Sequence, residues 1–437
     1  MEIPFKFSAL LLFVLILPIV ASSQPAAVQT RLRNTITEFI EVYNSGDTHV
    51  YRNFLKSKIT GAELDDKLQR FNNTWHSIGK VALHDIVIVD SLNVQAIVQE
   101  KNYGSWWKFT IQTDHNQQFL KRTVLPILMP ESGVKNGILK HAEIISELDR
   151  YITDTLKNGF AGNVLIANQG RIFYDKSFGR DNHGEANTRS SEFGLASSAK
   201  LFTAVAIMQL KDRGKLTLDD KVIKHFPALK NPVYQQITIG QLLTHSAGLG
   251  DFFENPSYKE GETNIGNRAT AMQFIENPGA DFSPGTGFRY SNTGFLLLGF
   301  IIEQISSMPF ADYVNQHIFS QAKMSHTKAG NGAGGGSSTV SDLTKFFSSL
   351  NRYELLSRQN TRNLLNFIYK DNYGYGSEHQ LLGKEHIFGH SGGFIRQCVE
   401  LNFYSRSKQL VIILSNTNPP FGHYLSNKIK SLLIRKP

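Results

Sequence analysis

Cysteine is almost absent from this sequence of 437 residues, since Cys398 is the only one. An intramolecular disulfide is therefore excluded, and packing must stabilise the folded chain. The sequence also lacks a block of like charges, although its formal net charge is +9. We interpret the densest basic group as the solvated face of a final helix: Lys428, Lys430, Arg435 and Lys436. We therefore expect no nucleic-acid partner.

Long apolar runs are missing after the first 23 residues, so we expect no stable membrane span. The run from Leu10 to Val20 follows Lys6 and precedes the small residues 21–23. It is shorter than the roughly 20 residues that cross a bilayer, and this order is typical of a cleaved secretory signal peptide. Residues 1–23 are thus predicted to be a signal peptide, and the mature protein to be exported, either periplasmic or secreted.

The sequence contains 41% hydrophobic and 11% aromatic residues, which is typical of a globular protein. Its length favours two folded units. Pro130 to Gly137 contains the proline, serine and two glycines typical of a linker. We therefore predict one domain over residues 24–135 and another over residues 136–437, and we leave the oligomeric state open.

The first domain is predicted to begin with helices and to continue with a sheet. Apolar residues recur at helical spacing at Leu32, Ile36, Phe39, Ile40 and Tyr43. Gly46 is predicted to end this helix, and Asp47 to cap a second one that buries Tyr51, Phe54 and Leu55. Strand patterns follow at residues 81–89, 94–99 and 106–112. This order resembles the cone-shaped α+β domain of the nuclear-transport-factor-like and SnoaL-like group, whose members hold ligands or partners or act only as spacers.

The second domain has strand patterns at both ends and a mainly helical middle. A helix spacing at Ile145, Leu148, Ile152 and Leu156 precedes a predicted hairpin around residues 168–170. Strands at residues 399–404 and 410–414, and a helix from about Tyr424, end the chain. We expect one antiparallel sheet that is closed by the first and last segments.

Ser197-Ser198-Ala199-Lys200 opens an apolar segment, Leu201 to Leu210, that is predicted to be a buried helix ending at Gly214. Residues three apart share a helix face, so Lys200 can reach the Ser197 hydroxyl. Burial disfavours the charged form of a lysine, which suits the base of a serine nucleophile. Alone, the spacing is a weak signal, because it also arises from an N-cap serine and a solvated lysine.

Tyr290-Ser291-Asn292 follows the turn-forming residues 283–285 and precedes a predicted buried helix from Phe295. Such a loop can present a phenol and an amide to one cleft. Beside a cationic Lys200 the phenolate of Tyr290 should be favoured, and it could relay a proton to a leaving group. The alternative is a tyrosine that only packs at a helix start.

Gly389-His390-Ser391-Gly392-Gly393 stands just before a strand predicted over residues 394–404. Its glycines permit close approach of a substrate to the backbone. The run also matches the Gly-x-Ser-x-Gly nucleophile elbow, which makes Ser391 a rival nucleophile. The elbow requires a helix after the serine, and the candidate partners Glu400 and His423 follow too closely, so we favour Ser197.

These three ordered motifs resemble those of the β-lactamase-related serine hydrolases, relatives of class C β-lactamases and D,D-peptidases. The similarity extends from about Phe160 to the C-terminus and includes residues 237–249 and 333–343. It implies a β-lactamase/transpeptidase-like domain with an antiparallel sheet, flanking helices and an all-helical subdomain. The whole chain is then a two-domain α+β protein.

The resemblance implies acyl transfer in two steps, with Ser197 as the nucleophile and Lys200 and Tyr290 jointly as the base. Asn292 would orient Lys200 or a substrate amide, and the amides of Ser197 and Gly393 would form the oxyanion hole. The remaining substrate-side residues that the resemblance implies are His390, Ser391 and Gly392. No metal or organic cofactor is implied.

His390 stands where penicillin-recognising relatives often carry lysine, and by resemblance it should face the cleft opposite Lys200. A neutral histidine there would attract a substrate carboxylate weakly at neutral pH. The substrate stays open among small-molecule or cell-wall-type compounds: an ester, an amide or D-peptide, or a β-lactam. The alternative function is a penicillin-binding or sensor-type protein that is acylated, or binds, without efficient turnover.

Three further signals are discounted. Gly330 to Gly335 has a Gly-x-Gly-x-x-Gly spacing, but we expect a loop before a helix capped by Thr339, not a nucleotide site. His386 and His390 are four residues apart in a predicted strand without carboxylate partners, so metal binding is not expected. His245 is interpreted as a histidine that hydrogen-bonds a loop.

Overall fold

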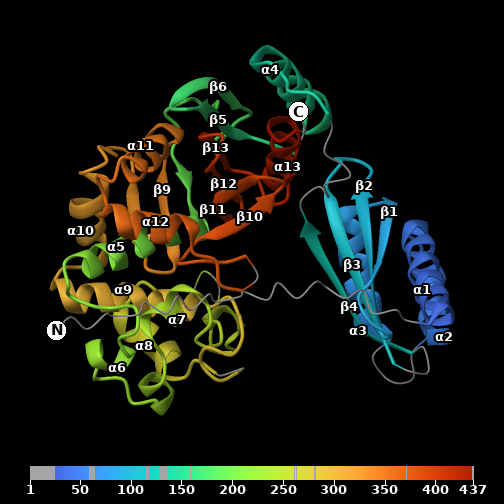
Figure 1. Cartoon of the computed structure of the whole chain (residues 1–437), viewed down its shortest axis with the longest axis horizontal. Coiled ribbons are helices and arrows are strands. Elements are labelled where there is room, and N and C mark those ends of the chain that lie inside the picture. Colours follow the sequence, from blue (N-terminus) through green and yellow to red (C-terminus); the bar gives the residue numbers. More distant parts are fainter. Residues whose placement is uncertain are drawn as a thin grey trace, which may run out of the picture. The chain divides into compact units, whose positions relative to one another are not determined.

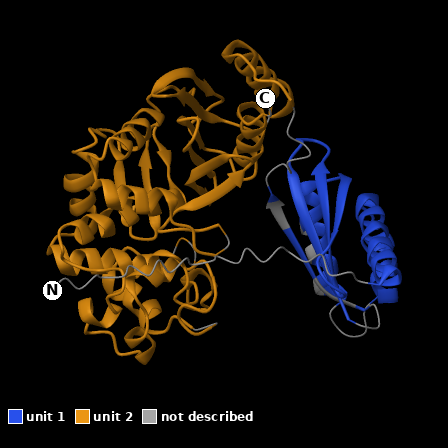
Figure 2. Ribbon diagram, in the orientation of Figure 1, with its two compact units in different colours: residues 1–127 blue, residues 128–437 orange. Residues whose placement is uncertain are grey.

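The structure is a computed structural model that describes residues 25–58, 64–114, 118–127, 136–157, 159–259, 261, 263–279, 282–370 and 372–435. It divides into unit 1, residues 1–127, and unit 2, residues 128–437 (Figure 2). The predicted signal peptide and most of the predicted linker lie outside the described residues. Within the described part, no single helix is long and apolar enough to cross a bilayer. One pair bent by 77°, Asn292–Ser306 with Phe310–Phe319, passes that test only jointly.

The described part of unit 1 has three helices followed by a four-stranded antiparallel sheet, and Figure 1 shows how they are arranged. The helices are α1 (Ala26–Ser45), α2 (Thr48–Lys58) and α3 (Leu64–Ile78). The strands, adjacent in chain order, are β1 (Val81–Ile88), β2 (Asn93–Glu100), β3 (Trp106–Thr113) and β4 (Phe119–Ile127). The helices and the first three strands agree with the sequence patterns, while those patterns did not single out α3 and β4.

Local signals explain the start of unit 1. Gly46 ends α1 with a φ of 67°, as predicted, because glycine adopts the left-handed region without a steric penalty. Asp47 accepts the His49 amide at 2.7 Å and so caps α2. Buried aromatic rings join the helices to the sheet, and Tyr43 lies edge-on to Phe109 with centroids 5.0 Å apart.

Unit 2 is organised around a six-stranded antiparallel sheet of order β10-β11-β12-β13-β5-β6. The strands are β5 (Gly162–Asn168), β6 (Arg171–Phe178), β10 (Glu378–Leu382), β11 (Glu385–Phe394), β12 (Gln397–Tyr404) and β13 (Gln409–Ser415). Because β5 pairs with β13, the first and last strands in the sequence are neighbours within the sheet, as expected. The predicted hairpin joins β5 to β6, with positive φ at both Gln169 and Gly170.

Helices cover both faces of this sheet (Figure 1). On one face α13 (Phe421–Leu433) packs on β12 and β13 and also contacts α4 (His141–Arg150), which continues as η2 (Tyr151–Thr155). On the other face α11 (Val340–Asn351) contacts β13 and β5, and α5 (Lys200–Asp212) contacts β11. In α4 the buried residue of the first turn is Ile144, whereas the sequence analysis had chosen Ile145.

The remaining elements extend from the second face. They are η3 (Ala196–Ala199), α6 (Val222–His225), η4 (Pro232–Gln235), α7 (Ile239–Leu243), η5 (Phe252–Glu254), α8 (Arg268–Glu276), α9 (Asn292–Ser306), α10 (Phe310–Val314), η6 (Asn315–Phe319) and α12 (Arg358–Asn366). A small sheet of order β7-β9-β8 lies among them, built from Phe193–Gly194, Gly334–Ser338 and Lys328–Asn331. One core, centred on the buried helices α5 and α9, joins these helices to the main sheet.

Three further local predictions were wrong. Residues 330–335 are not a plain loop, because they form most of the β8–β9 hairpin; the helix cap at Thr339 is confirmed. Residues 394–404 are not one strand, since the chain turns at Ile395 and Arg396 between β11 and β12. Lys430 is not on a solvated face: it is 4% exposed on the side of α13 that faces the sheet.

Candidate active site

Ser197 lies in the short 3₁₀ turn η3, directly before the buried helix α5. The backbone enters this turn through Ala196, whose φ of 45° is in the region that favours glycine. Both the amide and the hydroxyl of Ser198 donate to the Leu195 carbonyl, the hydroxyl at 2.7 Å. These bonds hold the turn so that Ser197 lines a pocket.

Lys200 begins α5 and is completely buried beneath Ser197. Its Nζ donates to Ser197 Oγ at 3.2 Å, to Asn292 Oδ1 at 2.7 Å and to the carbonyl of Ala333. Burial lowers the pKa of Lys200 to about 7, although Asp251 and Glu378 favour its charged form. A lysine with a pKa near neutrality, whose Nζ lies 3.2 Å from a serine Oγ, can accept the proton of that hydroxyl.

Asn292 reaches Lys200 because Asp251 holds it in place. The Asp251 carboxylate accepts both the backbone amide of Asn292 at 2.9 Å and its side-chain Nδ2 at 2.7 Å. The Asn292 oxygen must then point at the lysine. Ser291 caps α9 through a bond from the Gly294 amide to its hydroxyl. Sequence analysis missed Asp251, whose only signal is that it closely follows the family-like segment 237–249.

Tyr290 lies beside the lysine, with Lys200 Nζ 4.8 Å from the centre of its ring. Within the described residues its buried hydroxyl makes no hydrogen bond at standard distance. Burial raises the pKa of Tyr290 well above its usual range, and the neighbouring Ser197 opposes this only in part. The sequence analysis expected a favoured phenolate. The electrostatics oppose this, because the loss of solvation, together with the nearby Glu378 and Asp251 carboxylates, disfavours the phenolate.

The glycine-rich hairpin β8–β9 completes the surroundings of the lysine. A Cβ at Gly332 would lie 2.4 Å from the Phe295 carbonyl, so glycine lets the hairpin approach α9. The hairpin then presents the Gly332 and Ala333 carbonyls to α5, where they accept from Thr203 and Lys200. Sequence analysis noted this segment as family-like but did not predict that its backbone would contact the lysine.

The Gly389–Gly393 run lies inside strand β11, not before a strand. A Cβ on Gly392 would meet the Leu195 carbonyl at 2.5 Å, so this glycine allows β11 to lie against the Ser197 turn. Gly393 lines the pocket next to Ser197. Ser391 donates to Glu378 at 2.8 Å, and no turn into a helix follows it, so the nucleophile-elbow geometry is absent there.

His390 does not face the cleft, which corrects the expectation from the resemblance. Its side chain is buried, its Nε2 pairs with the Tyr373 hydroxyl at 2.9 Å, and its Nδ1 lies against the Ser391 carbonyl. Burial lowers the pKa of His390, opposed by Glu378, so the ring is neutral near pH 7. Tyr373 and Glu378 come from a segment without a recognisable pattern, which is why sequence analysis missed both.

The other histidines have structural contacts. His245 Nδ1 accepts the Ser291 amide at 3.0 Å, so it hydrogen-bonds a loop as expected. His386 pairs with His379 at 2.9 Å rather than with His390. Among the described residues, no three or more His, Cys, Asp or Glu side chains are grouped so that they could hold a metal ion.

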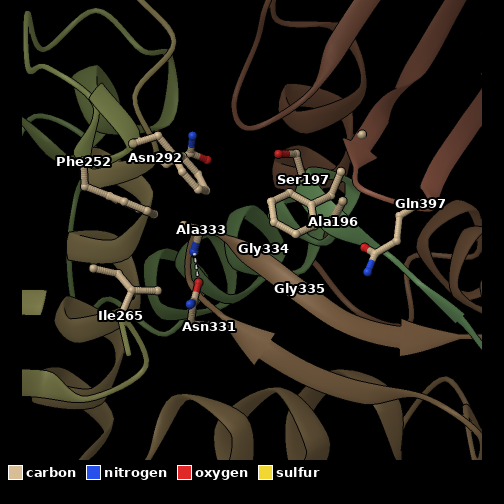
Figure 3. A pocket seen from close by; sticks show the side chains of 13 residues that line it. Ala196, Ser197, Phe252, Ile265, Asn292, Asn331, Ala333, Gly334, Gly335 and Gln397 are labelled. Carbon is tan, nitrogen blue, oxygen red and sulfur yellow. Dashed lines mark hydrogen bonds between the residues drawn. The ribbon is translucent and has the colours of Figure 1, made fainter. Parts of the chain in front are cut away.

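The pocket has a volume of about 570 Å³, which is in the range of small-molecule sites. Ser197 and Asn292 lie on opposite sides of it, with Phe252 and Ile265 on the Asn292 side (Figure 3). Of the expected site residues, Ser197, Asn292 and Gly393 line the pocket. Lys200, Tyr290, Ser391 and Gly392 do not line it; Ser391 and Gly392 belong to β11, where Gly392 lies against the Ser197 turn.

Known proteins resemble this chain over much of unit 2. The family described as Beta-lactamase matches residues 148–433. Penicillin-binding protein 4* of Bacillus subtilis (strain 168) is 38% identical over 181 residues, which cover 40% of this chain and 39% of that protein. A putative D-alanyl-D-alanine carboxypeptidase of Escherichia coli (strain K12) is 27% identical over 223 residues, 46% of this chain and 50% of that protein. The chain thus spans at most half the length of these curated relatives.

Solved structures have the same fold. A penicillin binding protein from Bacillus halodurans gives a TM-score of 0.57 at 25% identity and covers 68% of this chain and 100% of its own. A D-amino acid amidase from Ochrobactrum anthropi SV3, complexed with L-phenylalanine amide, gives a TM-score of 0.58 at 19% identity. It covers 66% of this chain and 97% of its own. At that identity the second structure is similar in fold alone.

Proposed function

Because its match over residues 148–433 makes this chain a member of the Beta-lactamase family of serine hydrolases, we propose that Ser197 is its nucleophile and forms an acyl-enzyme. The observation that carries the proposal is the 3.2 Å contact between Ser197 Oγ and the buried Lys200, whose pKa is lowered to about 7. A carbonyl compound in the pocket would meet the hydroxyl and its base together.

In the first step neutral Lys200 takes the proton of Ser197 while Oγ attacks the substrate carbonyl. The negative charge that develops on the carbonyl oxygen is stabilised by the Ser197 and Gly393 amides. As the tetrahedral intermediate collapses, the leaving group takes a proton from Lys200, directly or through Tyr290. The raised pKa of Tyr290 makes it a neutral donor, so Lys200 is the initial base.

In the second step water attacks the acyl-enzyme. Lys200, again neutral, accepts a proton of that water; as the intermediate collapses the bond to Ser197 Oγ breaks, and Oγ takes this proton from Lys200 to become a hydroxyl again. Asn292, fixed by Asp251, keeps Lys200 aimed at the serine throughout. The substrate class is an ester, an amide or D-peptide, or a β-lactam, since relatives include penicillin-binding proteins and a putative carboxypeptidase. We also propose that the protein acts after export, because residues 1–23 have the pattern of a secretory signal peptide.

Replacement of the two candidate serines tests the proposal. Ser197→Ala should lower hydrolysis of p-nitrophenyl butyrate to the background rate and abolish labelling by a fluorophosphonate probe. Ser391→Ala should keep measurable activity, because Ser391 bonds Glu378 and does not line the pocket. Activity in Ser197→Ala, or a probe adduct on Ser391, would overturn the assignment.

Intact mass separates an enzyme from a protein that is only acylated. An enzyme shows a transient acyl adduct and product in large excess over protein. A stable one-to-one adduct with each substrate class would favour the sensor-type alternative.

A further inference from the structure

Among the described residues that line the pocket above Ser197, none has a charged side chain. The thirteen described residues that line it are Ala196, Ser197, Phe252, Phe253, Ile265, Asn292, Asn331, Ala333, Gly334, Gly335, Gly393, Phe394 and Gln397. The large side chains are apolar, and the polar ones are a hydroxyl and three carboxamides. These carboxamides can bond a neutral amide or ester, but none of them can neutralise an anion.

Most of the charged side chains that the structure describes near the pocket have other partners. Lys200 is buried and donates to three oxygens, and Asp251 binds Asn292. Arg289 is ion-paired with Glu254. Arg396, at the tip of the β11–β12 hairpin, lines a different pocket together with Asp181 and Glu192. His390, the residue that the family resemblance would aim at a substrate anion, is buried against Tyr373.

Large apolar side chains are exposed beside the pocket. Phe253 and Phe394 both line it and are 44% and 42% exposed, and Ile395, next to Phe394, is 63% exposed. Phe253 follows Phe252 in η5, and Phe394 ends β11 beside Gly393, so they belong to different elements. An apolar group that lodged there would remove their surfaces from water, which is favourable in proportion to the area covered.

We propose that this site takes uncharged esters or amides with an apolar acyl group that packs against Phe253 and Phe394, and that it rejects acyl groups that carry a carboxylate. This specificity rests on the acyl-enzyme function proposed above. A carboxylate that entered the pocket would lose solvation without gaining a counter-ion, whereas an alkyl or aryl group would gain contact.

A matched pair of substrates tests the selectivity. p-Nitrophenyl hexanoate and the p-nitrophenyl half-ester of adipate have acyl chains with equal numbers of carbon atoms, and only the terminal group differs. The kcat/KM of the hexanoate should exceed that of the adipate half-ester by at least about tenfold at pH 7.5. It should exceed that of the acetate by about fourfold for each methylene that the pocket buries. If turnover is slow, the same ratios are measured from acyl-enzyme formation by intact mass.

Variants test whether Phe394 causes this substrate selectivity. Phe394→Ala should reduce the preference for hexanoate over acetate about threefold to tenfold. Phe394→Lys should raise the adipate-to-hexanoate ratio about tenfold, because it supplies the missing cation. The matched control is Leu381→Lys, at a 64% exposed apolar residue on β10 that does not line the pocket, and it should leave both ratios unchanged.

The outcomes distinguish the two proposals. If the fluorophosphonate probe does not label Ser197 and no ester is turned over or acylates the protein, the acyl-enzyme function itself fails. If Ser197 is labelled and esters react, but the adipate half-ester reacts as well as the hexanoate, only the specificity is overturned. An unchanged ratio in the folded, labelled Phe394→Lys variant likewise overturns the role of Phe394.

Discussion

The chemistry proposed for this site depends on one buried amino group, that of Lys200. Its three acceptors come from η3, α9 and the β8–β9 hairpin, so packing rather than solvent holds it. Burial lowers its pKa to about 7, whereas burial raises that of Tyr290. The two groups therefore shift in opposite directions, and at neutral pH the lysine accepts a proton while the tyrosine keeps one.

The pH dependence of the reaction follows from the lysine. Protonated Lys200 cannot accept the Ser197 proton, so kcat/KM should rise with pH through about 7. Asp251 is the principal charge that favours the protonated form. Asp251→Asn should therefore move this rise to lower pH and increase the share of maximal activity kept at pH 6 about twofold to threefold.

The measurement is a pH profile of p-nitrophenyl butyrate hydrolysis, with Glu354→Gln as the control. Glu354 pairs with Arg352 at the surface and should leave the profile unchanged. A profile of Asp251→Asn that is lower at every pH but not displaced would mean that Asp251 acts only by holding Asn292.

At the scale of elements, α13 is joined to the sheet by a buried polar cluster. Glu400 on β12 pairs with His423 and accepts from Ser426 at 2.9 Å, and Lys430 lies close enough to influence its charge. Burial alone would raise the pKa of Glu400, but these partners lower it to about 2. The pKa of His423 is raised, because Glu400 outweighs the effect of burial. Glu400 and His423, which were considered above as partners of Ser391, thus join β12 to α13.

Glu400→Gln should destabilise unit 2 by about 3 kcal/mol, because it leaves His423 and Lys430 without their anion. The Glu400 contribution is present above its unfolded pKa and is lost as pH falls towards 2. The His423 contribution is present below the unfolded pKa of about 6.5 and is lost as pH rises through the folded value. Urea unfolding should therefore show the largest loss at pH 5 to 6.

The control for this experiment is again Glu354→Gln, which removes an exposed ion pair and should change stability little. Equal stability of Glu400→Gln and the unaltered protein between pH 5 and 6 would contradict the idea that this cluster fixes α13.

On the scale of the whole molecule, all residues of the candidate site belong to unit 2. Each unit has its own sheet and its own buried core. A fragment of residues 136–437 should therefore unfold cooperatively and keep its kcat/KM for p-nitrophenyl butyrate within about twofold of that of the full chain. Circular dichroism during urea unfolding and the esterase assay check both points. A folded but inactive fragment would show that unit 1 contributes to the site.

Local patterns were sufficient for much of the architecture. Apolar periodicity and turn residues predicted the first two helices, the strands that begin and end the main sheet in the sequence, and the buried helix after Ser197. Each of these elements depends on neighbours within a few residues. The Ser197–Lys200 spacing is equally local, since it follows from the geometry of one helical turn. The three motifs together also indicated the family.

Long-range packing decided the rest. The bond from Lys200 to Ala333, the support of Asn292 by Asp251 and the burial of His390 against Tyr373 each join segments that carry no common pattern. The pKa shifts depend on the same packing, because desolvation is set by every neighbour of a group and not by its place in the sequence. The sequence therefore contained the proposed nucleophile and its proposed base, while the three-dimensional packing shifted the pKa of Lys200 and left the described lining of the pocket without a charged side chain.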